Sequence, residues 1–89
     1  MLYMVIEHFH SGKQREIYMR FDKMGRQMPP GVNYINSWLN EEVTVCYQLM
    51  EVASLIKLNG WMEQWKDLVD FEVVPVISSD EAKRKIMAG

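Results

Sequence analysis

The order in which apolar, strand-like runs alternate with helical segments is the feature that most constrains the fold of this chain. Runs rich in β-forming residues cover residues 2–9, 32–39, 43–52 and 70–77. One segment of helical periodicity follows the first run, and another follows the third. Because strand–helix–strand crossovers are right-handed, this order predicts a ferredoxin-like βαββαβ sandwich of the α+β class, with both helices on one face of the sheet.

Sequence signals at both ends of the first helical segment give its expected bounds. Ser11 and Gln14 have the spacing of a capping box, so the helix is expected to begin there. The Pro-Pro-Gly sequence at 29–31 is expected to end it, because proline cannot continue the hydrogen-bond ladder. The basic residues of the segment, including Arg20 and Arg26, are expected to face solvent.

The rest of the chain predicts a second helix, an edge strand and a short third helix. Ser54 is expected to cap the second helix, in which apolar residues recur at helical spacing as far as Leu68. Pro75 cannot donate to a strand ladder, which predicts that the fourth strand lies at an edge or ends there. Ser78 and Glu81 repeat the capping-box pattern before the third helix.

Length and composition limit the classes of function. At 89 residues, the chain is expected to form a single ferredoxin-like domain over residues 1–89. A net charge of −2 argues against a nucleic-acid partner, which would need a basic patch. The single cysteine cannot form an internal disulfide, and no apolar run is long enough for a secretory signal or a membrane span. The expected location is therefore the cytoplasm, without a membrane partner.

Strands that are apolar on both sides predict a second copy of the chain as partner. In the first run, Leu2 and Ile6 point to one side, and Tyr3 and Val5 point to the other. Strands of this kind normally have both faces covered, but two helices cover only one face of the sheet. The sequence therefore predicts a homodimer in which sheet meets sheet about a two-fold axis.

The two sides of the strands differ in chemistry, and the more uniform apolar side is expected to face the helices. That side holds Met4, Ile6, Ile35, Leu39, Val45, Tyr47, Leu49, Phe71 and Val73. The side expected to face the partner holds Tyr3, Val5, Glu7, Tyr34, Asn36, Trp38, Cys46, Gln48, Met50, Glu72, Val74 and Val76. Apolar walls with a few polar groups are typical of a small-molecule pocket.

Seven residues of the second set are candidates for a ligand pocket. They are Glu7, Tyr34, Asn36, Trp38, Cys46, Gln48 and Glu72. If the two carboxylates approached each other, repulsion and burial would raise one pKa and create a general acid or base. Alternatively, each carboxylate meets a positive side chain or the Gln48 amide in a structural contact. Cys46 has no recognisable base beside it and is expected to be a buried, unreactive thiol, so no catalytic residue is assigned.

Other kinds of site find less support in the sequence. His8 and His10 could hold a zinc or nickel ion, but no third ligand occurs at a recognisable spacing, so no metal site is predicted. An RNA-recognition module has the same strand order, yet it needs several aromatic residues on its central strands, where Tyr3 is the one expected here. No cofactor motif is present, so no cofactor is predicted.

Four stretches of the chain resemble a known family: MLYMVIEHF at the start, the Pro-Pro-Gly turn into YINSW, CYQLMEV, and FEVVPVISS. They are similar to short, mostly bacterial proteins known only as a domain of unknown function. That family resembles in fold the dimeric α/β-barrel group of ferredoxin-like proteins, which includes cofactor-independent monooxygenases, haem-degrading enzymes and muconolactone isomerase. The resemblance implies a homodimer and brings no established catalytic residues.

Three hypotheses for function follow. The leading one is a homodimeric protein that binds a small, mostly apolar molecule between sheet and helices or in the dimer interior. The second is a cofactor-independent enzyme of the monooxygenase or isomerase kind, in which Glu7 or Glu72 moves a proton and Tyr34 and Trp38 stack on a ring. The third is a structural oligomer whose own side chains fill its interior.

Overall fold

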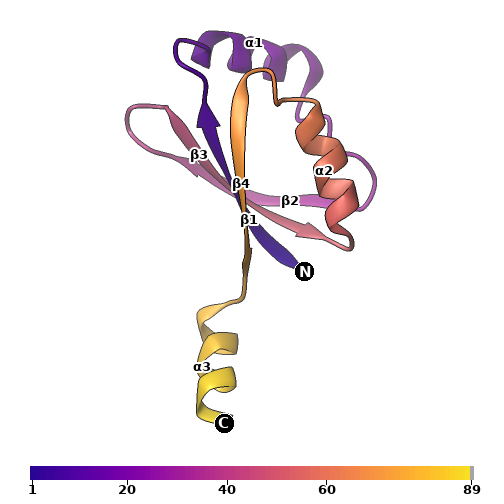
Figure 1. Cartoon of the computed structure of the whole chain (residues 1–89), viewed down its shortest axis with the longest axis vertical. Coiled ribbons are helices and arrows are strands. Elements are labelled where there is room, and N and C mark those ends of the chain that lie inside the picture. The colour runs from indigo at the N-terminus through magenta and orange to yellow at the C-terminus, as the bar shows by residue number, and fades with distance from the viewer. Residues whose placement is uncertain (89) are drawn as a thin grey trace.

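The computed structural model describes residues 1–88, which form a four-stranded sheet and three helices. Their overall arrangement is extended (Figure 1). The elements in chain order are β1 (Leu2–Phe9), α1 (Gln14–Met24), β2 (Val32–Leu39), β3 (Val45–Val52), α2 (Leu55–Glu63), β4 (Val69–Val76) and α3 (Ser79–Ala88). This βαββαβα order confirms the predicted α+β, ferredoxin-like fold with a short C-terminal helix.

The sheet is antiparallel throughout and has the strand order β2-β3-β1-β4. The prediction that the fourth strand lies at an edge is confirmed, because β4 pairs with β1 alone. Pro75 is thus placed where a missing N–H costs little. β2 and β3, which follow each other in the chain, pair as an antiparallel hairpin.

The ends of α1 differ from the prediction, while the other two helix starts agree with it. Gly25 has a φ of 66° and ends α1 directly after Met24, before the Pro-Pro-Gly sequence is reached. The capping box predicted at Ser11 is wrong, since the cap residue is Lys13 and forms no side-chain cap hydrogen bond. Ser54 and Ser78 each accept a hydrogen bond from a backbone N–H at a helix start, as predicted.

The core lies between the sheet and the helices α1 and α2. Its fully buried members are Val5 on β1, Met50 and Val52 on β3, and Leu58 on α2. Ile17 of α1 and Trp61 of α2 belong to the same cluster, so both helices cover one side of the sheet, which we call the helix face. We call the opposite side the open face.

The predicted assignment of strand sides is wrong for β1 and β3. Val5, Cys46, Gln48 and Met50 are buried on the helix face, and Glu7 is directly paired with Cys46 there. The residues predicted to face the helices from these two strands, Met4, Ile6, Val45, Tyr47 and Leu49, lie on the open face. The assignment is correct for β4, whose Phe71 and Val73 pack against the core. Both sides of β1 and β3 are apolar enough that alternation alone does not identify the covered side.

A β-bulge explains why β2 departs from simple alternation. The register with β3 shifts between Tyr34 and Asn36, so Tyr34 and Ser37 both lie on the helix face. Leu39 is also on that face, opposite Cys46, as predicted for its side. Ile35, by contrast, is 49% exposed at the bulge and does not pack in the core.

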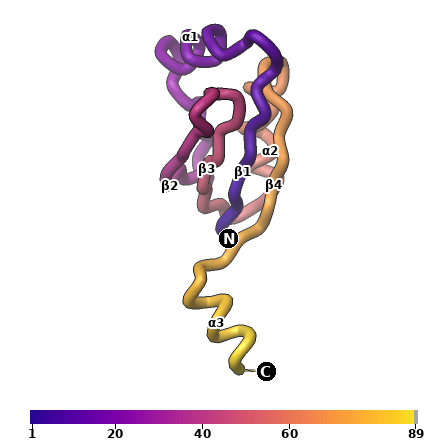
Figure 2. The backbone as a smooth tube through the Cα atoms, turned by 90° about the vertical axis from the view of Figure 1, so that its left-hand side faces the viewer, coloured from indigo at the N-terminus to yellow at the C-terminus, as the bar shows by residue number. Residues whose placement is uncertain are grey.

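The helix α3 extends away from the sheet, as Figures 1 and 2 show. None of its residues is buried, and Ile86 and Met87 are more than three-quarters exposed. The Cα radius of gyration of 14.6 Å exceeds the value of about 12 Å typical of a compact chain of this length. Within residues 1–88, none of the helices combines the length and apolar character needed to cross a membrane.

Candidate functional site

A pocket of about 140 Å³ lies between the helix face of the sheet and the helices α1 and α2. Three of the seven candidate residues, Glu7, Cys46 and Gln48, line it together. The other lining residues are Phe9, Ile17, Tyr18, Phe21, Arg26, Ser37, Leu39, Trp61, Trp65 and Val69. Most of these side chains are apolar or aromatic, and the polar groups are few, as in sites that bind small organic molecules.

A chain of hydrogen bonds links the polar groups of the pocket. Gln48 Nε2 donates to Glu7 Oε2 at 2.8 Å, and Arg26 Nε donates to Gln48 Oε1 at 3.1 Å. Gln48 is therefore satisfied at both ends of its amide although only 4% of its surface is exposed. The alternative in which a candidate carboxylate meets the Gln48 amide therefore holds for Glu7, and the two residues meet on the helix face.

Arg26 is fixed by aromatic contacts as well as by the amide. Its guanidinium carbon lies 3.7 Å from the Tyr34 ring centroid and 4.8 Å from that of Phe21. Its backbone carbonyl accepts hydrogen bonds from the indole N–H groups of Trp61 at 2.7 Å and Trp65 at 3.3 Å. The residue after Gly25 is thus held both at its backbone and at its side chain.

Burial changes the protonation chemistry of two pocket residues. Burial raises the pKa of Glu7 from 4.5 to about 7, against the opposing effects of Cys46, Arg26 and Gln48. Burial, together with the neighbouring Glu7 carboxylate, raises the pKa of the Cys46 thiol to about 12. Glu7 can therefore gain or lose a proton near neutral pH, whereas Cys46 stays a thiol and is a poor nucleophile.

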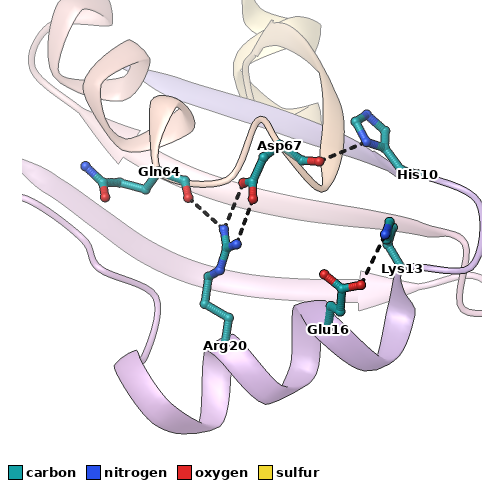
Figure 3. Close-up of polar contacts among 6 residues, drawn as sticks. All are labelled: His10, Lys13, Glu16, Arg20, Gln64 and Asp67. Atoms are coloured by element: carbon teal, nitrogen blue, oxygen red, sulfur yellow. Dashed lines mark hydrogen bonds and ion pairs between the residues drawn. The ribbon is translucent and has the colours of Figure 1, made fainter.

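An ion pair connects α1 to the segment that joins α2 and β4 (Figure 3). Arg20 donates from Nη1 and Nη2 to the two carboxylate oxygens of Asp67 at 2.9 and 2.7 Å, and Nη1 also donates to the Gln64 carbonyl. The pKa of Asp67 lies below its ordinary value because of this hydrogen bonding. The ion pair fixes the relative position of the two segments that carry Tyr18, Trp65 and Val69 into the pocket wall.

The remaining candidate residues do not join the pocket. Tyr34 lies beside it, where its ring stacks on Arg26 and its hydroxyl is 2.6 Å from Ser37 Oγ. Asn36, Trp38 and Glu72 lie on the open face, paired with Leu49, Tyr47 and Ile6 respectively. Glu7 and Glu72 are therefore on opposite sides of the sheet, and the predicted carboxylate pair does not form.

The two histidines of β1 and the following turn each contact a carboxylate. His8 Nε2 is 3.5 Å from Glu72 Oε1, and His10 Nε2 is 3.0 Å from Asp70 Oδ1. The second ring nitrogen of His10 contacts the Asp67 carbonyl at 3.1 Å (Figure 3). Over residues 1–88, no group of three or more histidine, cysteine, aspartate or glutamate residues is arranged to hold a metal ion.

Sequence reasoning did not identify Arg26, Trp61 and Trp65 as residues of the site. The prediction that Arg26 faces solvent on a helix is wrong, because the helix ends before it. Gly25 was the available signal, since glycine directly after a helical run favours a helix end and takes the next residue off the helical surface. No comparable signal distinguishes tryptophans that line a pocket from tryptophans that fill a core.

Comparison with known proteins identifies a family but no role. The family model described as Domain of unknown function (DUF3303) matches residues 1–89. No curated protein and no solved structure matches the chain. What the pocket can hold therefore has to be inferred from its own chemistry.

Proposed function

The chain belongs to the family described as Domain of unknown function (DUF3303), and we propose that it binds a small, mostly apolar molecule in the pocket between the sheet and the helices α1 and α2. One observation carries this proposal: the pocket combines aromatic walls with a single carboxyl group, that of the partly buried Glu7. Burying an ionisable group in an apolar cavity lowers stability, so such groups are found most often where they serve a purpose such as binding or catalysis. A polar atom of a ligand that bonds to Glu7 would supply that purpose.

Filling the mouth of the pocket tests this proposal. Leu39 lies on the edge strand β2, lines the pocket and is 38% exposed, so a larger side chain can enter without disrupting the core. We expect Leu39→Trp to weaken binding of a small aromatic probe, benzyl alcohol, by about tenfold or more, because the indole occupies ligand space. Isothermal titration calorimetry measures this change.

The matched control places the same side chain on the same strand outside the pocket. Ile35→Trp, at the bulge, should leave the affinity for benzyl alcohol within about twofold of the unaltered chain. Equal affinity of both variants, at a level seen with the unaltered chain, would exclude this pocket as the binding site.

A second candidate function is catalysis of proton transfer, and the raised pKa of Glu7 favours it. A carboxylate with a pKa of about 7 is well matched to removing a proton from carbon beside a carbonyl group. Returning that proton to another carbon of the same substrate completes an isomerisation, which needs no oxidant or cofactor. Gln48 would hold Glu7 in position through its amide.

A homodimer formed through the open face accompanies either function in our proposal. The open face carries apolar residues in each strand, with Trp38 52% exposed and Tyr47 40% exposed. Four strands of eight residues span roughly 500 Å² in plan, the order of magnitude of one side of a standard interface at ~800 Å². Such a surface is typical of an association site rather than of a free monomer.

The helix α3 supports a second copy as the occupant of the open face. None of its residues is buried, and Lys83, Arg84 and Lys85 form a basic run in its middle. The open face is bordered by Glu51, Asp70 and Glu72, which are acidic. When two open faces meet, α3 of each chain can therefore pack against the complementary surface of the other.

A charge on the open face should dissociate this dimer. We expect Trp38→Lys to convert a particle of twice the chain mass into one of a single chain mass, because each interface would bury two unpaired ammonium groups. Multi-angle light scattering at micromolar concentration gives the mass directly. Met19→Lys on α1, also exposed but on the other side of the molecule, should stay dimeric. A single-chain mass for the unaltered protein would refute the dimer.

A further inference from the structure

The guanidinium group of Arg26 is held in place, but only one of its three nitrogen atoms donates a hydrogen bond within the described chain. Nε is occupied by Gln48, and the guanidinium carbon lies over the rings of Tyr34 and Phe21. In the part of the chain that the structure describes, Nη1 and Nη2 form no hydrogen bond, and no buried side-chain nitrogen or oxygen is without a partner. The Nη groups therefore reach open space, and Arg26 is itself a lining residue of the pocket.

Arg20 provides a comparison within the same molecule, because both of its Nη groups donate hydrogen bonds. It also lies over an aromatic ring, that of Trp65 at 5.5 Å, but its Nη groups are taken up by Asp67 and Gln64. The nearest carboxylate to Arg26 along its hydrogen-bond chain is Glu7, which bonds to Gln48 instead of to the guanidinium. The paired donors of Arg26 are therefore available to a ligand.

Free, parallel guanidinium N–H groups on a fixed side chain match the geometry of a carboxylate. The pocket volume of about 140 Å³ is close to that of a cavity that holds one benzene ring, ~150 Å³. Phe9, Trp61 and Trp65 supply aromatic walls for such a ring. Volume, walls and donors together indicate one kind of molecule.

We infer that the ligand of this pocket is a small aromatic carboxylate, whose two oxygens accept hydrogen bonds from Arg26 Nη1 and Nη2 while its ring lies against the aromatic wall. This inference rests on the proposed binding function and specifies the class of ligand. Glu7 then lies beside a bound anion, and it is best accommodated in its protonated form. Binding of the carboxylate should therefore be accompanied by proton uptake at Glu7.

The test compares two probes of similar shape that differ in charge, benzoate and benzyl alcohol. At pH 6, we expect benzoate to bind at least about tenfold more tightly than benzyl alcohol, as charge-assisted bidentate hydrogen bonds would give. In Arg26→Gln this preference should disappear while benzyl alcohol still binds. Arg26→Lys, which keeps the charge but lacks the paired donors, should restore only part of the preference.

The matched control removes an equal charge from a different place. Arg15 is exposed on α1 and lies outside the pocket, so Arg15→Gln should keep the full preference for benzoate. If Arg15→Gln lowers benzoate binding as strongly as Arg26→Gln, the preference is a long-range charge effect and the inference fails. Equal binding of both probes to the unaltered chain would refute the ligand class and leave the binding function intact. If neither probe binds at millimolar concentration, both proposals fail.

A pH series gives a second readout. Four titratable or charged groups would surround a ligand. They are Glu7 of β1, Tyr18 of α1, Cys46 of β3, and Arg26, which follows α1. Of these, only Glu7 is expected to change charge between pH 6 and pH 8, so benzoate affinity should fall over this range and benzyl alcohol affinity should not. Glu7→Gln should remove the fall. A benzoate affinity that is independent of pH would contradict the placement of the anion beside Glu7.

Discussion

Trp61→Ala is expected to destabilise the chain by about 3–5 kcal/mol, a large part of the ~5–15 kcal/mol that holds a typical domain folded. Trp61 is 2% exposed and packs edge-on against Phe71, with ring centroids 5.7 Å apart. The truncation would leave a cavity that merges with the pocket and would remove the indole donor to Arg26. Urea unfolding followed by far-UV circular dichroism measures the loss.

Two comparison variants separate packing from hydrogen bonding. Trp61→Phe keeps most of the ring volume and loses the N–H, so its cost should be nearer ~1 kcal/mol, because Trp65 still donates to the Arg26 carbonyl. Ile56→Ala on the same helix is 80% exposed in the structure and should change the free energy of unfolding by less than about 0.5 kcal/mol. A Trp61→Ala variant as stable as Ile56→Ala would show that α2 does not pack as described.

The second large effect is a loss of stability as pH rises through neutrality. The pKa of Glu7 is 4.5 when the chain is unfolded and about 7 when it is folded. Below pH 4.5 both states hold the proton and no penalty exists, whereas above pH 7 the folded state carries a buried charge. At ~1.4 kcal/mol per pKa unit, the free energy of unfolding should fall by about 2.5 kcal/mol between pH 5 and pH 8.

Glu7→Gln should remove this pH dependence and should make the chain more stable than the unaltered one at pH 8. The glutamine carbonyl can still accept the hydrogen bond that Gln48 now donates to Glu7. Glu42→Gln is the matched control, because Glu42 is exposed in the turn between β2 and β3, away from the pocket, and it should keep the full fall. Urea titrations of the three proteins at several pH values give the comparison. An identical pH profile for Glu7→Gln and the unaltered chain would place the titrating group elsewhere.

The same Glu7→Gln variant distinguishes binding from proton transfer. If the chain only binds its ligand, this variant should keep measurable affinity for benzyl alcohol, and neither it nor the unaltered chain should convert a substrate. An enzyme should also keep that affinity, but its rate on a substrate with an acidic C–H bond should fall by about 10²-fold or more. Stability at pH 8 is expected to increase in both cases, so loss of folding cannot be mistaken for loss of chemistry.

The sequence predicts the order of elements well, because each element has its own local signal. Alternation identifies the four strands, Ser54 and Ser78 identify two helix starts, and Pro75 identifies an edge strand. Those signals depend on backbone chemistry within a few residues. They do not depend on which surfaces of the elements pack against one another.

The side of each strand that meets the helices could not be predicted in the same way. The uniformly apolar side of β1 and β3 was expected to meet the helices. The helices instead cover the side that carries Glu7 and Gln48, where Gln48 bonds to both Glu7 and Arg26. These hydrogen bonds satisfy the polar groups on the covered side, and they join three segments that are distant in the sequence. The bulge after Tyr34 adds a further shift that alternation does not contain.

The position of β1 in the sheet also bears on how the chain folds. β1 pairs with β3 on one side and with β4 on the other, so residues near position 5 have partners near positions 48 and 73. Contacts of this length dominate the sheet, and closing them is slow because long loops must be ordered first. On the ribosome, β1 can pair with β3 once residue 52 has been synthesised, but its other edge stays unpaired until β4 follows. Until β4 is synthesised, that edge of β1 therefore exposes unpaired backbone N–H and C=O groups to other chains.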